Sequence, residues 1–470
     1  MAFSPPILTV RDIIGDAVEP ADFPSATIRF RNDRWAGKVG LGGLDDEAWA
    51  NHFARFQPLP DNLPEPLALR YHGHQFGRYN PQLGDGRGFL FAQLEGPVGR
   101  VLDLGTKGSG QTPYSRQGDG RLTLKGAVRE ILASSYLEAL GVNTSKTFSV
   151  IETGEALHRG DEPSPTRSAV MVRLQHSHIR FGSFQRLAYF EDVAGLERLL
   201  RHCVETYHPG ADRPVVSDMA AAFLEAVGTA TARMVGQWMA SGFVHGVMNT
   251  DNFNVTGETF DFGPYRFLPT SDPNFTAAYF DETGLYRFGR QPTQALWALQ
   301  QLGSALLPLS NSEDLAAALV GFEAAYQDAF NAHTFFLLGV EPPEALSEGL
   351  SFLQTLYAWM TETGADWPQT FFDLFGGRYS ADRRGKSPQS ALYADSLFSP
   401  VKSRLDDFEP ASRERLSHPY FASEVPVRLL IDDIEGLWAP IAERNDWSEL
   451  EAKLAHIAQL GHALGTIPDS

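Results

Sequence analysis

One stretch of the chain, HGVMNTDNFNVTGETFDFG at residues 245–263, places strong limits on the fold. Asn252 and Asp261 stand nine residues apart, and the segment between them, FNVTGETF, predicts a short strand, a turn and a second strand. Magnesium prefers hard oxygen ligands, so we expect Asn252 and Asp261 to be metal ligands.

Two further residues of this stretch carry polar side chains that could take part in chemistry. Asp251 precedes the first metal ligand, and we expect it to accept a proton from an attacking hydroxyl group. The alternative is that Asp251 only makes a turn or a supporting hydrogen bond. His245 is expected to support the loop by hydrogen bonding rather than to react.

Upstream of this stretch, residues 84–174 predict strand, strand, helix, strand and strand. The runs of apolar and β-branched residues indicate the strands, and apolar residues at helical spacing indicate the helix, with Gly141 as its stop. The four expected strands and the helix are, in chain order, 89–94, 101–107, 124–140 (the helix), 146–154 and 168–174.

Several residues of this β-rich region are candidates for contact with a phosphate. The loop GDGRG at 84–88 lacks Cβ atoms at Gly84 and Gly86 and carries the charge of Arg87, although an ordinary hairpin turn is the alternative. Lys107 closes a strand and Glu130 lies on the next helix, the order in which protein kinases place a phosphate-binding ion pair. A surface lysine and a solvated glutamate are the alternative.

Downstream, helices dominate. We expect helices at 217–243, with Ser217 or Asp218 as the N-cap, and at 294–306, 313–333, 344–362 and 423–464. Glycine, serine and proline in 370–400 indicate a long loop. The sequence therefore predicts an α+β, protein-kinase-like fold of two lobes, a β-rich N-lobe with one key helix and a larger α-helical C-lobe.

This fold divides the chain into four parts with two extensions outside the lobes. The expected parts are an N-terminal extension packed on the core at 1–70, the N-lobe at 71–180, the C-lobe at 181–365, and a C-terminal loop and helical extension at 366–470.

The segment from Pro163 to Phe190 contains no acidic residue, in a chain with 39 Lys and Arg against 58 Asp and Glu. Arg173 and Arg180 lie in it, at the place where a kinase grips adenine. Guanidinium groups suit phosphate better than adenine, so we expect the triphosphate tail to point at Arg173 and Arg180. A solvated basic face is the alternative.

A nucleotide seated in this way is reversed relative to a kinase, and its α-phosphate faces the acceptor. Attack there transfers AMP and releases pyrophosphate. Two alternatives stay open: γ-phosphoryl transfer, with Asp251 replacing the kinase base whose place is taken by Val247, and an inactive nucleotide-binding scaffold.

Bulk composition excludes some partners. The net charge of −19 disfavours nucleic acid and anionic membranes. No secretory signal and no long apolar run is present, so no membrane span is expected. Cys203 is the only cysteine, which excludes an internal disulfide and favours the cytoplasm.

Five motifs together resemble the selenoprotein O family of kinase-like protein adenylyltransferases. They are HGHQFGRYNPQLGDGR, TKGSGQTPYSRQGDGR, REILASSYLEALGV, SHIRFGSFQ and HGVMNTDN…DFGPYRFLP. The resemblance implies ATP as substrate with Mg²⁺ or Mn²⁺, UTP use with Mn²⁺, and acceptors that are Ser, Thr or Tyr hydroxyls of proteins, with the enzyme itself among the candidates.

The resemblance also assigns roles to single residues. Asp251 corresponds to the proton acceptor, Asn252 and Asp261 to the metal ligands, and Glu130 to the partner of Lys107. The nucleotide-binding residues that it implies are Gly84, Gly86, Arg87, Lys107, Asp119, Gly120, Arg173, Arg180 and Asp261. For Asp119 and Gly120, an ordinary loop before the helix is the alternative.

The chain departs from the family pattern in its last third. The family's selenocysteine or cysteine near the C-terminus has no counterpart in GHALGTIPDS, and the expected Asn-Pro and Leu-Arg-Asn segment is missing. We therefore expect no redox control through a C-terminal cysteine, and a different mode of substrate docking.

Overall fold

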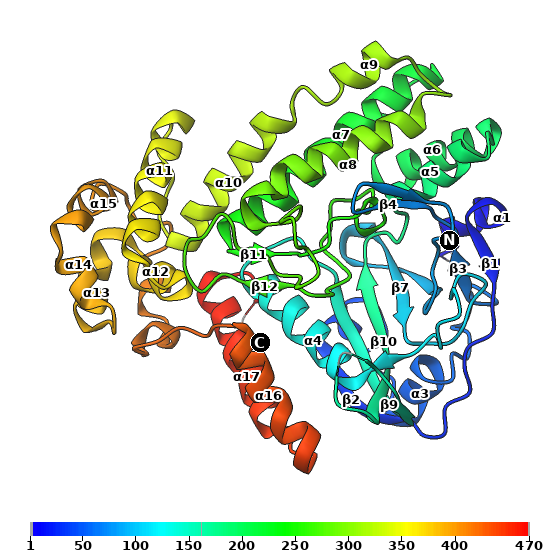
Figure 1. The fold of residues 1–470 in the computed structure, drawn as a ribbon, viewed down its shortest axis with the longest axis horizontal. Helices are drawn as coiled ribbons and strands as arrows, with labels where there is room; N and C mark the ends of the chain where they lie inside the picture. The colour runs from blue at the N-terminus through cyan, green and yellow to red at the C-terminus, as the bar shows by residue number, and fades with distance from the viewer. Residues whose placement is uncertain (1–2, 161, 469–470) are drawn as a thin grey trace.

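A β-sheet region and a larger helical region lie side by side in the computed structural model, which describes residues 3–160 and 162–468 (Figure 1). The predicted mixture of α and β structure, with strands concentrated early and helices late, is confirmed. No helix in the described part of the chain combines the length and apolar character that a membrane span requires.

The β-rich region is built on one eight-stranded sheet in the order β1-β3-β6-β7-β10-β9-β2, with β8 paired to β10. The paired strands run antiparallel. Their bounds are β1 Gly15–Ala17, β2 Thr27–Arg31, β3 Leu67–Leu69, β6 Leu90–Glu95, β7 Val101–Lys107, β8 Leu122–Thr123, β9 Lys146–Leu157 and β10 Thr166–Gln175.

The four strands expected from the sequence correspond to β6, β7, β9 and β10. The first 70 residues, expected as an extension packed on the core, supply strands to the sheet itself: β1 and β2 lie at its two ends and β3 beside β1. These strands are three to five residues long, and their side chains show no regular alternation of burial, so periodicity does not reveal them.

Helix α4, Leu124–Ala139, packs against β9 and β10 and carries Glu130. Thr123 caps its start by accepting a hydrogen bond from the backbone N–H of Gly126. The helix ends before Gly141, whose φ of 78° is accessible to glycine. The predicted helix and its stop are therefore confirmed.

The helical region centres on α7, Val216–Ala240, which packs against α8 and α10. Its N-cap is Val215, so the expected cap at Ser217 or Asp218 is wrong; both lie inside the first turn. The other helices here are α5 Phe181–Tyr189, α6 Val193–Tyr207, α8 Gln291–Leu306, α9 Ser312–Ala317, α10 Phe322–Leu338 and α11 Leu346–Thr363. The single helix expected at 313–333 is thus two, separated by a turn that ends at Gly321.

The long loop expected at 370–400 is wrong, because this segment forms several short helices. Several of its glycines, serines and prolines lie within these helices, and aromatic residues such as Phe371, Phe372 and Phe398 are buried and hold the helices in place. The helices from here to the end are α12 Trp367–Leu374, α13 Ala381–Lys386, α14 Ser390–Ala394, α15 Ser399–Leu405, α16 Ile431–Arg444 and α17 Ser448–Leu464.

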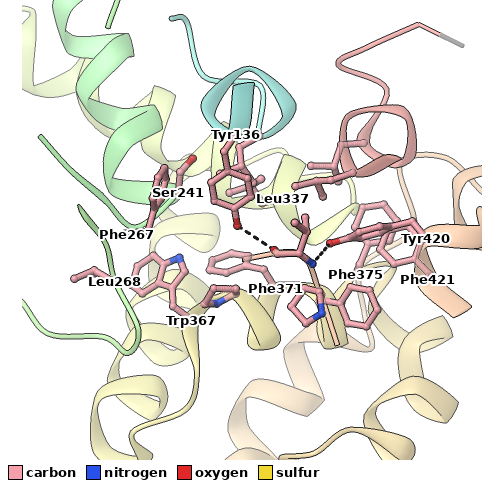
Figure 2. Close-up of a pocket in the computed structure, with 17 residues that line it drawn as sticks. Tyr136, Ser241, Phe267, Leu268, Leu337, Trp367, Phe371, Phe375, Tyr420 and Phe421 are labelled. Atoms are coloured by element: carbon pink, nitrogen blue, oxygen red, sulfur yellow. Dashed lines mark hydrogen bonds between the residues drawn. The ribbon is translucent and has the colours of Figure 1, made fainter. Parts of the chain in front are cut away.

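The C-terminal part of the chain is attached to α4 across a small apolar cavity of about 50 Å³ (Figure 2). Tyr136 of α4 donates a hydrogen bond from its hydroxyl to the carbonyl oxygen of Val427, and the N–H of Val427 donates to the hydroxyl of Tyr420 (3.2 Å each). The helix α17 packs along α4 as well. The helix that bears Glu130 therefore contacts the sheet, through β9 and β10, and the C-terminal part of the chain.

Candidate active site

A cavity of about 740 Å³ opens where the sheet meets the helical region. Residues from the glycine loop, the strand ends and the 245–263 stretch line it together. Among the sequence-predicted site residues, those that line it are Gly84, Gly86, Arg87, Lys107, Asp119, Gly120, Arg173, Arg180, Asp251, Asn252 and Asp261. The remaining one, Glu130, is buried and is held by Lys107.

Lys107 is the junction between the sheet, α4 and the 245–263 stretch. Its Nζ donates hydrogen bonds to Glu130 Oε1 and, over 2.7 Å, to Asp261 Oδ1. Lys107 and Glu130 are both buried, and buried charges are tolerated when they are paired. The structure thus brings together the ion pair and one of the two metal-ligand candidates.

Asp261 has an unusual backbone and a strongly favoured negative charge. Its φ of 61° lies in the left-handed region, which non-glycine residues adopt rarely and mainly where function requires it. Burial acts to raise the pKa of the carboxyl group, but Lys107, then Arg173 and Arg180, outweigh it and hold the pKa well below its ordinary value. Asp261 is therefore ionised at neutral pH.

The oxygen atoms of Asn252 and Asp261 fit a hard divalent cation. Asn252, in the 3₁₀ turn η4 (Thr250–Asn252), donates its amide N–H to the carbonyl of Val247 over 2.9 Å, which leaves Oδ1 free to bind a metal. Within the described residues no group of three or more His, Cys, Asp or Glu could hold a metal ion unaided. A cation here would therefore take its remaining ligands from phosphates and water, as magnesium commonly does.

Asp251 is buried beside these ligands with one carboxylate oxygen unsatisfied. Its backbone carbonyl accepts a hydrogen bond from Arg180 Nη1 (2.8 Å), but Oδ1 has no hydrogen-bond partner among the described residues. Burial raises the pKa of Asp251 to about 6. A Cβ on Gly73 would lie 2.9 Å from this Oδ1, so the close approach of the chain at Gly73 requires glycine.

Arg173 and Arg180 are buried, they line the cavity, and some of their N–H groups have no partner among the described residues. Arg180 Nη2 reaches Asp85 Oδ1 at 3.3 Å, Arg173 Nη2 lies 4.0 Å from Asp261 Oδ1, and the ring of Phe260 contacts both guanidinium groups. Nε and Nη1 of Arg173 and Nε of Arg180 have no hydrogen-bond partner in the described part of the chain. Unsatisfied buried cationic donors of this kind call for an anionic ligand.

The position of Arg180 follows from pairing between two loops. The N–H of Phe181 donates to the carbonyl of Phe253, and the N–H of Val255 donates to that of Ile179, each over 3.0 Å. The prediction of a strand, a turn and a second strand in FNVTGETF is therefore wrong, because its two arms do not form strands that pair with each other. Its two arms form isolated bridges with other segments, Asn254 with Arg180 and Thr259 with Thr144, because those segments offer the free backbone groups.

His245 supports this loop, as expected. Its ring Nε2 lies 3.1 Å from the carbonyl oxygen of Phe260, and its backbone N–H donates to the side chain of Gln291. Burial lowers its pKa, so the imidazole is neutral at physiological pH.

The glycines of the loop at 84–88 have a packing role as well as an open backbone. A Cβ on Gly84 would lie 2.3 Å from the ring of Tyr114, and one on Gly86 would lie 2.8 Å from the carbonyl oxygen of Tyr114. Glycine at both positions lets the segment that carries Tyr114 fold across the loop. Arg87 is exposed at the cavity.

Asp119 and Gly120 lie at the rim of the same cavity. Asp119 pairs with Arg159 at 2.8 Å, and burial, which acts to raise its pKa, is outweighed by that pair, so the pKa is lowered. Gly120 has a φ of 68° and passes so close to Gly110 that no side chain would fit.

Sequence reasoning missed several residues that line the cavity: Tyr71, Asp85, Tyr114, Arg116 and Arg159. Asp85, the acidic partner of Arg180, could have been found, because it stands between Gly84 and Gly86. The other four lie on loops whose approach to the cavity has no local sequence signal.

Comparison with known proteins places this constellation in a family. A family model described as "Protein adenylyltransferase SelO" matches residues 1–458. The chain belongs to the SelO family. Like its SelO relatives it is an enzyme of the nucleotidyltransferase class.

Cyanobacterial relatives show how far the similarity of this SelO chain extends. A protein of Synechocystis named "Protein nucleotidyltransferase YdiU" is 49% identical over 329 residues, which cover 69% of this chain and 68% of the relative. Proteins of the same name from Gloeobacter violaceus and Synechococcus elongatus are 42% and 40% identical, covering 95% and 97% of this chain and 92% and 94% of theirs. The similarity therefore includes the helical C-terminal part.

Proposed function

We propose that this chain is a protein adenylyltransferase, which transfers AMP from ATP to Ser, Thr or Tyr hydroxyls of proteins and releases pyrophosphate. The observation that carries the proposal is the set of unsatisfied N–H donors on Arg173 and Arg180, two buried residues that line the cavity. A pyrophosphoryl group would satisfy them, whereas adenine would leave two buried cations opposite a neutral ring.

Seating of the triphosphate tail against Arg173 and Arg180 determines the orientation of the whole nucleotide. The adenosine end then points outward, reversed relative to a kinase, and the α-phosphate lies between the tail and the cavity mouth. Lys107 on a strand, its partner Glu130 on a helix, and Asp261 after a loop support a protein-kinase-like fold of two lobes used in this reversed sense.

In the proposed reaction, the acceptor oxygen forms a bond to the α-phosphorus, and the bond from that phosphorus to the bridging oxygen of pyrophosphate breaks. The hydroxyl proton passes to Asp251, whose unpaired Oδ1 is available to accept it. Arg173 and Arg180 stabilise the negative charge that develops on the departing pyrophosphate. Preorganisation is the main contribution of these groups, because they are fixed before the substrate arrives.

Asn252 and Asp261 would hold Mg²⁺ or Mn²⁺ in this site. The ion would neutralise phosphate charge and help to fix the α-phosphate in position. Asp261 also keeps Lys107 in place through its Oδ1.

Labelled ATP tests the proposal. The protein is incubated with a generic unfolded acceptor protein and ATP labelled at the α- or the γ-phosphate, in Mg²⁺ and separately in Mn²⁺. Label from the α position should enter protein, the enzyme itself included. Label from the γ position alone would establish kinase-type transfer, and no label from either would favour an inactive scaffold. α-Labelled UTP with Mn²⁺ tests UMP transfer in the same assay.

A further inference from the structure

Three aromatic side chains stand exposed beside the cavity mouth. They are Phe76 at 37% exposure, Tyr279 at 86% and Phe280 at 46%, and we call them the rim patch. Phe76 and Phe280 have ring centroids 6.0 Å apart, and those of Tyr279 and Phe280 are 5.1 Å apart. Contiguous exposed aromatic surface of this kind marks an interaction site more often than a chance exposure.

The rim patch is joined directly to residues 249–252, the loop that carries Asp251 and that we call the catalytic loop. Phe76 is at the tip of the hairpin formed by β4 (Gly73–Gln75) and β5 (Arg78–Asn80), and its N–H donates to Asn249 Oδ1 over 3.1 Å. Asn249 lines the cavity and precedes Asp251 by two residues. The patch is therefore continuous with the place where an acceptor hydroxyl must arrive.

The hairpin is fastened to the same loop at further points. The N–H of His74 donates to Thr250 Oγ1 over 2.7 Å, and that hydroxyl donates to Gln185 Oε1 over 2.8 Å. Gln75, the residue before Phe76, lines the cavity itself. Since Gly73 also packs against Asp251, the hairpin and the catalytic loop form one unit.

The segment that carries Tyr279 and Phe280 is held in place by the buried residue Tyr286. The hydroxyl of the buried Tyr286 donates to Asn249 Oδ1 over 2.7 Å, and its ring lies 4.9 Å from that of Phe76. Asp281 accepts hydrogen bonds from the N–H groups of Leu285 and Tyr286, which closes the turn after Phe280. The aromatic rings are thus presented on ordered loops, and little further ordering is needed when a partner binds.

We propose that the rim patch binds an apolar or aromatic side chain of the acceptor protein, a few residues away from the hydroxyl that receives the nucleotide. The inference rests on the proposed function, because that function requires a protein segment at this mouth. Because Phe76 contacts Asn249, two residues before Asp251, only a few residues of an extended acceptor segment would separate the bound side chain from the hydroxyl. The patch itself is uncharged, so this contribution to binding should depend weakly on salt.

The variant Tyr279→Ser/Phe280→Ser tests the proposal in the full-length protein. Binding is measured by fluorescence polarisation with short, unstructured, labelled peptides that contain one threonine and a phenylalanine a few residues to either side. Matched peptides carry glutamine in place of phenylalanine. The control variant is Tyr379→Ser/Leu397→Ser, which removes two large side chains that are 48% and 47% exposed. They lie in the α12–α15 part of the chain, far from β4 (Figure 1).

We expect the rim variant to bind the phenylalanine peptides about tenfold more weakly than wild type, with the glutamine peptides weak in both. The control variant should bind as wild type does. Binding of a non-hydrolysable ATP analogue and the melting temperature should be retained in both variants, which shows that a loss is local.

Three results would overturn the proposal. Wild type could bind both peptide types equally, or the rim variant could keep its affinity for the phenylalanine peptides. The third result is that wild type is a dimer and the rim variant a monomer. The last would assign the patch to a second copy of the chain. Failure of AMP labelling together with loss of peptide binding would refute the proposed function but not the docking site. Normal labelling with unchanged peptide binding would refute only the docking site.

Discussion

Arg180 uses only part of the hydrogen-bonding capacity of its guanidinium group. Nη1 holds the backbone of Asp251 and Nη2 reaches Asp85, while Nε has no partner among the described residues. The rings of Tyr71 and Phe260 both contact the group, with centroids 4.4 Å and 4.9 Å from its central carbon. The side chain is therefore held in place before any ligand binds, as a group that acts on a reaction should be.

Replacement of this group should be costly. Arg180→Ala is expected to lower AMP-transfer turnover by about 10²- to 10³-fold, the scale of losing one preorganised charge contact. Turnover is measured with α-labelled ATP, beside melting curves that separate lost activity from lost folding. The control Arg201→Ala removes a half-exposed arginine that pairs with Glu197 within one helix. Wild-type activity in Arg180→Ala would show that this arginine does not contact phosphate.

Asp261 is the residue whose loss should abolish the metal-dependent turnover. Asp261→Ala is expected to abolish turnover at every Mg²⁺ or Mn²⁺ concentration, because a hard ligand and the second partner of Lys107 disappear together. Turnover is titrated with each metal, and chelation of the metal should silence wild type. Asp272→Ala, at an exposed position, is the matched control. Substantial residual activity would mean that the metal is bound elsewhere.

Single residues were predictable where their order along the chain carried the signal. Lys107, Glu130, Asn252 and Asp261 could be predicted to lie together because strand, helix and loop follow one another in a fixed order. Lys107, Asn252 and Asp261 line one cavity, and Glu130 pairs with Lys107. Gly73 could not, because its need for glycine comes from contact with Asp251, far away in sequence.

At the scale of elements, long periodic segments were predictable and short ones were not. The helices α4 and α7 have enough turns for an apolar stripe to stand out. The short helices in 370–400 have too few turns for a stripe to stand out, although their aromatic residues Phe371, Phe372 and Phe398 are buried in the core. Their stability comes from tertiary packing, which local sequence does not encode.

The attachment of the C-terminal part to α4 can be tested at two hydroxyl groups. Tyr136→Phe and Tyr420→Phe should each lower the free energy of unfolding by about 1 kcal/mol, because a polar backbone group of Val427 loses its partner (Figure 2). Urea unfolding measures the change, with the exposed Tyr189→Phe as control. Since both bonds end on Val427, the double variant should deviate from additivity. A change no larger than that of the control would show that these bonds do not stabilise the attachment.

At the scale of the whole molecule, Glu152 gathers three distant parts of the chain. It lies on β9 and pairs with Arg29 of β2 at 2.6 Å and with Arg167 of β10 at 2.6 Å. Arg167 also donates to the carbonyl of Ile441 and the side chain of Asn445 at the end of α16. Strands β2, β9 and β10 and the helix α16 are therefore linked through Glu152 and its partner Arg167.

This cluster predicts a pH dependence of stability. Burial acts to raise the pKa of Glu152, but Arg167 and Arg29 outweigh it, and the folded-state pKa lies below the ordinary 4.5. The ionised carboxylate thus stabilises the fold above about pH 4.5, and this contribution is lost as the pH falls through the folded-state pKa.

Glu152→Gln should therefore be less stable than wild type at neutral pH, and the difference should shrink on acidification. Thermal unfolding from pH 7 down to about pH 3 measures it. Glu205→Gln, at an exposed position of α6, should track wild type throughout. A gap that stays constant with pH would show that the carboxylate charge is not what joins these parts.

The unsatisfied guanidinium donors also indicate which inhibitors this enzyme should accept. A flat heteroaromatic ring seated against Arg173 and Arg180 would leave their free N–H groups unpaired. Compact bisphosphonates or sulfonates could instead satisfy those donors directly. Inhibitor discovery for this chain should accordingly begin from polyanionic fragments that pair with these donors.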